Sequence, residues 1–191
     1  MDSIASPIVK TFIPEKLTQR GGCGMKPKVE SLEGNGAARA ASAQSVADIL
    51  KRELEPTIRD WVALVEKEPE LIRIPLNYEE RTGHLPQLLH DVIARLRLDT
   101  QIKAPISAAA GHHGDLRHKQ GYTVADVVNE SRLLQVCIFT TLHKNTKHIE
   151  FSKLLPDVVT IADEVDAQLK QQMLRFMVAD IAEGKSNAKA N

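Results

Sequence analysis

Residues 113–134, HGDLRHKQGYTVADVVNESRLL, decide the fold because they predict two helices joined by a very short turn. Gly121 supplies the left-handed backbone conformation that ends a helix. Thr123 then caps the start of the next helix, with Asp126 three residues later as its capping-box partner. Two helices joined this closely run antiparallel. The stretch therefore predicts a helical hairpin centred on Gly121.

A stripe of side chains on the first of these helices begins apolar and ends polar. Its members advance by four, three, four and three residues, and are Ile106, Ala110, His113, Arg117 and Gln120. Glu130 lies seven residues beyond Thr123, about 10 Å along the second helix at ~1.5 Å per residue. We therefore expect Glu130 to face His113, with Arg117 one turn away. Tyr122 should stack on the guanidinium of Arg117.

The sequence divides into three parts. Residues 1–42 are rich in proline and glycine and keep no helical or strand period, so we expect a flexible leader. Residues 43–184 predict an all-α single domain of about five to six helices, because no strand pattern occurs there. Residues 185–191 are polar, and we expect a frayed tail.

The helices are predicted from apolar residues at helical spacing. The first begins after Ser45, and Pro56 should kink or split it. A short turn of helix is expected at 78–82, and another around 151–155, ahead of the last helix. The helix that follows Gly121 is apolar nearly all round between residues 133 and 142, so we expect it to be central and buried.

Composition excludes several classes of partner. Lys plus Arg number 25 and Asp plus Glu number 25, and no long basic run occurs, which argues against nucleic acid as a partner. Apolar runs are too short to span a bilayer. We expect no membrane association, no secretory signal and a cytoplasmic location. Cys137 sits in an apolar run and should be a buried, inert thiol, whereas Cys23 should be exposed, so no disulfide is expected.

Several separated segments resemble one family. The segments are His84-Leu85-Pro86, the run from His113 to Tyr122, Glu130-Ser131-Arg132 and the amphipathic helix around Trp61. Over residues 45–180 they are similar to the N-terminal domain of RsbT co-antagonist (RsbRD-type) proteins. The matching positions are His84, His113, Gly114, Arg117, Gln120, Gly121, Tyr122 and Glu130.

The resemblance implies a sensory domain of the kind found ahead of STAS or histidine kinase modules. It also implies an antiparallel bundle, or a fold like a globin without haem. No such module follows the last helix, so we expect a stand-alone regulatory domain and not an enzyme. It would act through protein–protein contacts in bacterial-type stress or two-component signalling. The partner would be a kinase, a phosphatase, a STAS-type regulator or a second copy, and the input a small molecule or a proton.

Two interpretations of the polar residues stay open. The residues in question are His84, His113, Arg117, Gln120, Tyr122 and Glu130. They either form a satisfied buried network that sets helix register, or line a ligand site or a switch in which a histidine beside a carboxylate titrates near neutral pH. An alternative function is a haem or di-metal redox or gas sensor. We expect no metal and no cofactor, because aromatic residues are sparse and only one Asp-x-x-His spacing occurs, at Asp115 and His118. His118 should face solvent.

The last helix ends in a broadly apolar stretch. Met173, Phe176 and Met177 either complete the core or form a surface for a partner or a second copy. The spacing of these residues is compatible with both interpretations.

Overall fold

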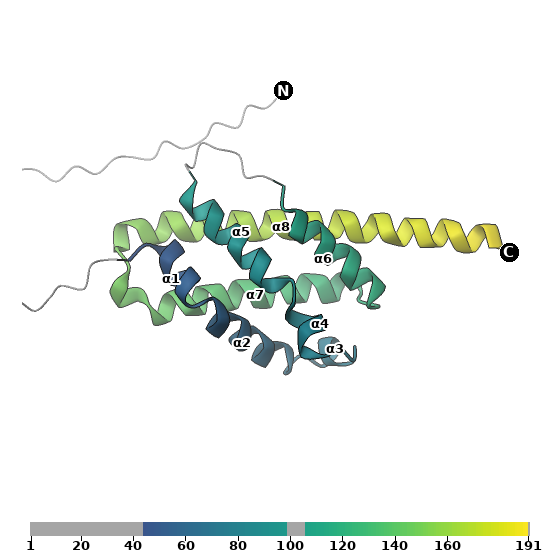
Figure 1. Ribbon diagram of the computed structural model, residues 1–191, viewed down its shortest axis with the longest axis horizontal. Coiled ribbons are helices and arrows are strands. Elements are labelled where there is room, and N and C mark those ends of the chain that lie inside the picture. Colours follow the sequence, from purple (N-terminus) through teal and green to yellow (C-terminus); the bar gives the residue numbers. More distant parts are fainter. Residues whose placement is uncertain (1–43, 99–105, 191) are drawn as a thin grey trace, which may run out of the picture. The chain divides into compact units, whose positions relative to one another are not determined.

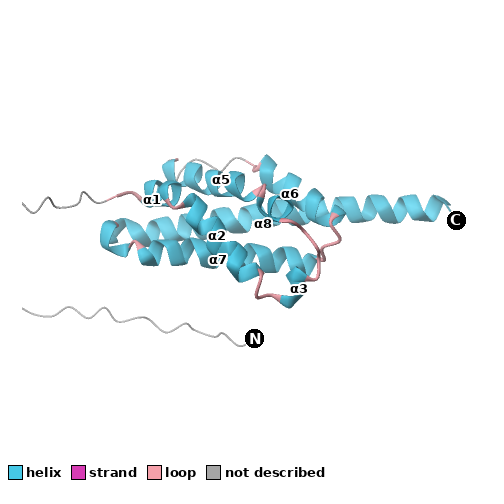
Figure 2. Cartoon of the chain, turned by 60° about the horizontal axis from the view of Figure 1, so that its bottom comes forward, coloured by secondary structure: helices cyan, strands magenta, loops and turns pink. Residues whose placement is uncertain are grey.

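The computed structural model describes residues 44–98 and 106–190, with side chains through residue 183. The predicted leader, residues 1–42, lies outside the described residues, as does Cys23. The described residues contain eight α-helices, one 3₁₀-helix and no strand, so the all-α prediction is confirmed (Figures 1 and 2). In chain order they are α1 (Val46–Arg52), α2 (Leu54–Val65), α3 (Pro69–Ile72), α4 (Tyr78–Thr82), α5 (Leu85–Arg97), α6 (Ala108–Lys119), α7 (Val124–Lys144), η1 (Thr146–His148) and α8 (Phe151–Ala190).

The first predicted helix is split in two. Ser45 caps α1 by accepting a hydrogen bond from the Asp48 amide at 3.1 Å. The chain breaks its helical path at Glu53, and Pro56 falls in the first turn of α2. A proline is tolerated there because the amides of a first turn have no partner inside the helix. This split, together with the short α3, makes the helix count higher than the predicted five to six.

The hairpin of α6 and α7 forms as predicted. Gly121 has a φ of +78°, and the backbone amide of Tyr122 donates to the Arg117 carbonyl at 3.1 Å. That pairing is the Schellman ending of a helix. Thr123 and Asp126 form the expected capping box at the start of α7. The expectation that Ile106 begins the stripe on α6 is wrong, because the helix starts at Ala108 and the Ile106 side chain is 78% exposed.

Two helices, α2 and α8, pack against the hairpin of α6 and α7. α7 packs against α2 on one side and α8 on another, while α6 runs along α8. A Cβ at position 114 would collide with the backbone carbonyl of Gln172, so Gly114 is what allows α6 and α8 to approach so closely. The prediction that α7 is central and buried is confirmed, because it packs against α1, α2 and α8 and buries most of its side chains between residues 133 and 142, although Val136 is 41% exposed.

The last helix is longer than predicted. α8 is one continuous helix of 40 residues that includes Pro156, so the separate short helix expected at 151–155 does not form. It also runs through Gly184 to Ala190, so residues predicted as a frayed tail form its last turns. Figure 1 shows the C-terminal end of α8 (yellow) extending past the other helices. None of the described helices is both long and apolar enough to cross a membrane.

Candidate functional site

Arg117 lies at the centre of a buried polar network. Its side chain is fully buried, and each nitrogen of the guanidinium donates a hydrogen bond. Nε donates to Glu130 Oε2 at 2.8 Å, Nη1 to Gln120 Oε1 at 2.7 Å, and Nη2 to the carbonyl of Arg81 at 2.8 Å. A buried arginine needs acceptors at each of its nitrogens, because unpaired donors carry a desolvation cost.

Glu130 and Tyr122 complete the network from the α7 side. The Tyr122 hydroxyl donates to Glu130 Oε1 at 2.7 Å, so both oxygens of the carboxylate are engaged. The Tyr122 ring lies 4.7 Å from the Arg117 guanidinium carbon, which confirms the predicted stacking. Burial raises the pKa of Glu130, and the hydrogen bonds from Arg117 and Tyr122 oppose that rise. Burial and the adjacent Glu130 raise the pKa of Tyr122, so its hydroxyl stays a donor.

The network contains a second arginine that was not predicted from the sequence. Arg81 of α4 is 8% exposed, and its guanidinium donates to the Tyr122 hydroxyl at 3.3 Å and to the Ile74 carbonyl at 3.0 Å. The backbone carbonyl of Arg81 in turn accepts from Arg117. Arg81 follows two glutamates in a five-residue helix. Such a short helix has no residue pattern that would distinguish a buried arginine from an exposed one.

His84 and His113 form a stacked histidine pair beside the network. Their ring centroids are 3.8 Å apart and the planes differ by 26°. His113 Nε2 lies 3.6 Å from Glu130 Oε2, so the predicted facing of these residues across the hairpin is confirmed. Burial lowers the pKa of both histidines well below the usual value, and the Arg117 charge adds to the effect. Of the two open interpretations, the lowered pKa values do not support the one in which a histidine beside a carboxylate titrates near neutral pH, because burial disfavours the protonated form of both rings.

The space beside the histidine pair is small. A cavity of about 10 Å³ is lined by the pair together with Trp61, Gln168 and Gln172, and it is about as large as one water molecule. A haem macrocycle does not fit there, so these residues do not support the haem alternative. Both nitrogens of His84, Nδ1 of His113 and Oε1 of Gln172 have no hydrogen-bond partner among the described residues.

α8 carries a stripe of buried polar residues that was not predicted from the sequence. Glu164, Gln168 and Gln172 are each at most 4% exposed. The amide of Gln168 donates to Glu164 Oε1 at 3.0 Å and to the Leu88 carbonyl of α5 at 3.1 Å. The three residues are spaced by four and stand one position before the apolar residues Val165, Leu169 and Met173. That regular spacing is the signal in the sequence that could have identified them.

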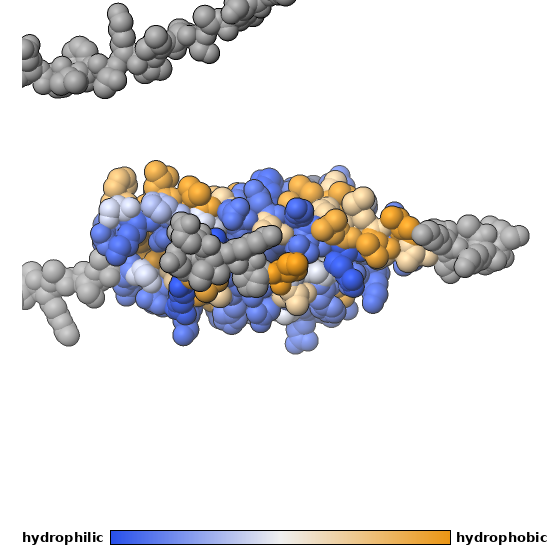
Figure 3. Space-filling view, turned by 90° about the horizontal axis from the view of Figure 1, so that it is seen from above, coloured by the Kyte–Doolittle hydropathy of each residue, from blue (hydrophilic) through white to orange (hydrophobic). Residues whose placement is uncertain are grey.

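The predicted partner surface at the end of the chain divides between core and solvent. Phe176 is 6% exposed and its ring lies 4.9 Å from that of His118 in an edge contact. The side chain of His118 is 9% exposed, so the prediction that it faces solvent is wrong. Met173 packs against the core. Met177 is instead 54% exposed, and it lies among other exposed apolar residues of α8, which are Leu174, Val178 and Ile181. Figure 3 shows hydrophobic residues gathered beside the grey C-terminal end of α8.

Comparisons with known proteins add no family assignment. The chain matched no model of a protein family, no curated protein and no solved structure. The resemblance to RsbRD-type domains therefore stays a prediction from the sequence motifs. Within the described residues, no group of three or more His, Cys, Asp or Glu side chains is placed to hold a metal ion.

Proposed function

We infer that this chain is a sensory or regulatory domain that acts through protein–protein contacts, with α8 as the helix that passes the signal on. One observation carries the proposal. α8 contributes Gln172 to the buried polar interior, and the same helix exposes the apolar side chains of Leu174, Met177, Val178 and Ile181. A helix with apolar residues exposed to solvent marks an interaction surface. The RsbRD resemblance, which implies a sensory domain coupled to an output module, supports the same interpretation.

The close contact between α6 and α8 is compatible with two discrete packings of these helices, between which a signal could switch the domain. Gly114 lets the backbones of α6 and α8 touch, since a Cβ there would collide with the Gln172 carbonyl, and we propose that α8 moves past this contact in one step. Two packings separated by such a step are the kind of element that a signal can bias. The partner in this proposal is a kinase, a phosphatase, a STAS-type regulator or a second copy of the chain.

Site-specific photo-crosslinking tests the proposal. A photoreactive residue replaces Met177 in the full-length chain, and the matched control carries it at Arg59, which is exposed on α2. In the cells of origin, position 177 should give one discrete adduct, identified by mass spectrometry as a signalling protein or a second copy. Its yield should change when Glu130 is replaced by Gln, because that substitution disturbs the network. No more adduct at position 177 than at position 59 would reject the proposal.

A further inference from the structure

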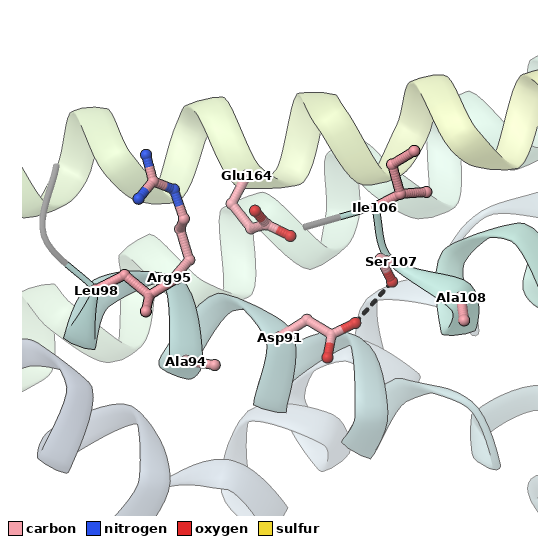
Figure 4. Close-up of a pocket in the computed structure, with 8 residues that line it drawn as sticks. All are labelled: Asp91, Ala94, Arg95, Leu98, Ile106, Ser107, Ala108 and Glu164. Atoms are coloured by element: carbon pink, nitrogen blue, oxygen red, sulfur yellow. Dashed lines mark hydrogen bonds between the residues drawn. The ribbon is translucent and has the colours of Figure 1, made fainter. Parts of the chain in front are cut away.

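A pocket separate from the histidine pair lies between α5, α8 and the start of α6. Its volume is about 130 Å³, and its lining includes Asp91, Arg95, Leu98, Ile106, Ser107 and Glu164. Figure 4 shows the Arg95 and Glu164 side chains entering it from α5 and α8. An engineered protein cavity of about 150 Å³ binds benzene. The pocket therefore has room for a ligand of roughly six non-hydrogen atoms.

Arg95 lines this pocket and carries buried hydrogen-bond donors. Its Nε and Nη1 atoms are buried, and neither has a hydrogen-bond partner among the described residues. Leaving a guanidinium N–H buried and unpaired is costly. An arginine in this state is suited to bind an anionic group, above all a carboxylate.

The two acidic residues of the pocket differ in how many of their carboxylate oxygens already accept a hydrogen bond. Both oxygens of Asp91 already accept hydrogen bonds, one from Ser107 at 2.6 Å and one from Gln87 at 3.0 Å. Glu164 is 4% exposed and directs its carboxyl group into the pocket, where Gln168 donates to one oxygen (Figure 4). Arg95 and Glu164 form no ion pair with each other among the described side chains. The pocket thus holds a positive and a negative group apart, with apolar walls between helices.

We propose that this pocket binds a small zwitterion of the amino-acid class, whose carboxylate pairs with Arg95 and whose ammonium group pairs with Glu164. One ligand then satisfies the unpaired donors of Arg95 and supplies a cation to a buried carboxylate. A simple carboxylate or a simple amine can satisfy only one of the two. The inference concerns binding alone and does not rest on the proposed function. If both hold, Gln168 connects them, because it contacts Glu164 and also lines the cavity of the histidine pair.

Titration of the full-length chain by calorimetry and by amide NMR tests the proposal. The probes are glycine, alanine, β-alanine and γ-aminobutyrate, with acetate and propylamine as compounds that carry a single charge. At least one zwitterion should bind with saturation and shift the amide signals of Ala94, Ser107 and Ala108, while acetate and propylamine should bind about tenfold more weakly or not at all.

Variants of the full-length chain decide which residues carry the binding. Arg95→Gln and Glu164→Gln should each weaken it by about tenfold or more. The control Arg97→Gln removes an arginine from the same helix, one that pairs with Asp48 outside the pocket, and should leave binding unchanged. The proposal is overturned if no zwitterion binds, if acetate binds as well as alanine, or if Glu164→Gln binds like the wild type. Should Arg95→Gln fail to fold, Glu164→Gln and the single-charge compounds still test whether both charges are needed.

Discussion

Replacing Glu130 with Gln should destabilise the protein severely, although the two side chains have almost the same shape. The substitution removes the only carboxylate that pairs with the fully buried Arg117 among the described residues. Removing one partner of a buried ion pair costs about 3–5 kcal/mol, because the other charge stays buried without compensation. Arg117 keeps its hydrogen bonds to Gln120 and to the carbonyl groups of Glu80 and Arg81. We therefore expect the lower end of the range, about 3 kcal/mol.

Urea unfolding near neutral pH, followed by circular dichroism, measures this loss. In a thermal melt it should appear as a decrease of about 6–12 °C, since ~1 kcal/mol corresponds to about 2–4 °C in a chain of this size. The control is Glu66→Gln on the exposed end of α2, which should change the free energy of unfolding by no more than about 0.5 kcal/mol. A loss below about 1 kcal/mol in Glu130→Gln would refute the reasoning that the pair is desolvated and essential.

The remaining predictions concern packing, pH and the end of α8. Gly114→Ala should lower the free energy of unfolding by about 2 kcal/mol or more, despite the ~1 kcal/mol that alanine gains in helix propensity, because its Cβ would meet the Gln172 backbone. Gly111→Ala would meet only the flexible Arg175 side chain, so thermal melts should show it to be neutral or stabilising. Burial holds the pKa of both histidines of the pair below its usual value, so on acidification the unfolded chain binds protons at these histidines before the folded chain does. The free energy of unfolding should therefore fall as pH drops below about 6.5, by up to ~1.4 kcal/mol per pH unit for each histidine. A free energy of unfolding that does not change with pH in this range would contradict the prediction. Phe176→Ala should cost about 3–5 kcal/mol and Met177→Asp less than about 0.5, as only the first is buried; equal losses would mean that Met177 also packs in the core.

The hairpin could be predicted from sequence because its determinants are local. A left-handed glycine, a capping box and a fixed rise per residue place Glu130 opposite His113 without knowledge of any other element. The stacking of Tyr122 on Arg117 follows from the same short-range geometry. Each of these features depends on residues close in the chain, where spacing determines position.

The features that sequence reasoning missed depend on contacts between distant elements. Arg81 joins the network only because α4 packs over the end of the hairpin. The spacing of the polar stripe on α8 is visible in the sequence, but its burial depends on α5, since the Gln168 amide donates to the carbonyl of Leu88. The low pKa of His113 also follows from distant contacts, because it comes from burial and from the nearby His84 and Arg117.

The two sides of the buried polar interior differ in how fully their polar atoms are hydrogen-bonded. On the α4–α6–α7 side, Arg117 has a hydrogen-bond acceptor for each guanidinium nitrogen, so separating these helices would expose unpaired charge. On the α8 side, Gln172 Oε1, both nitrogens of His84 and Nδ1 of His113 have no hydrogen-bond partner among the described residues. A displacement of α8 would break fewer hydrogen bonds than a displacement of α6 or α7. Under the proposed function, the hairpin would be the fixed frame and α8 the helix that responds to the signal.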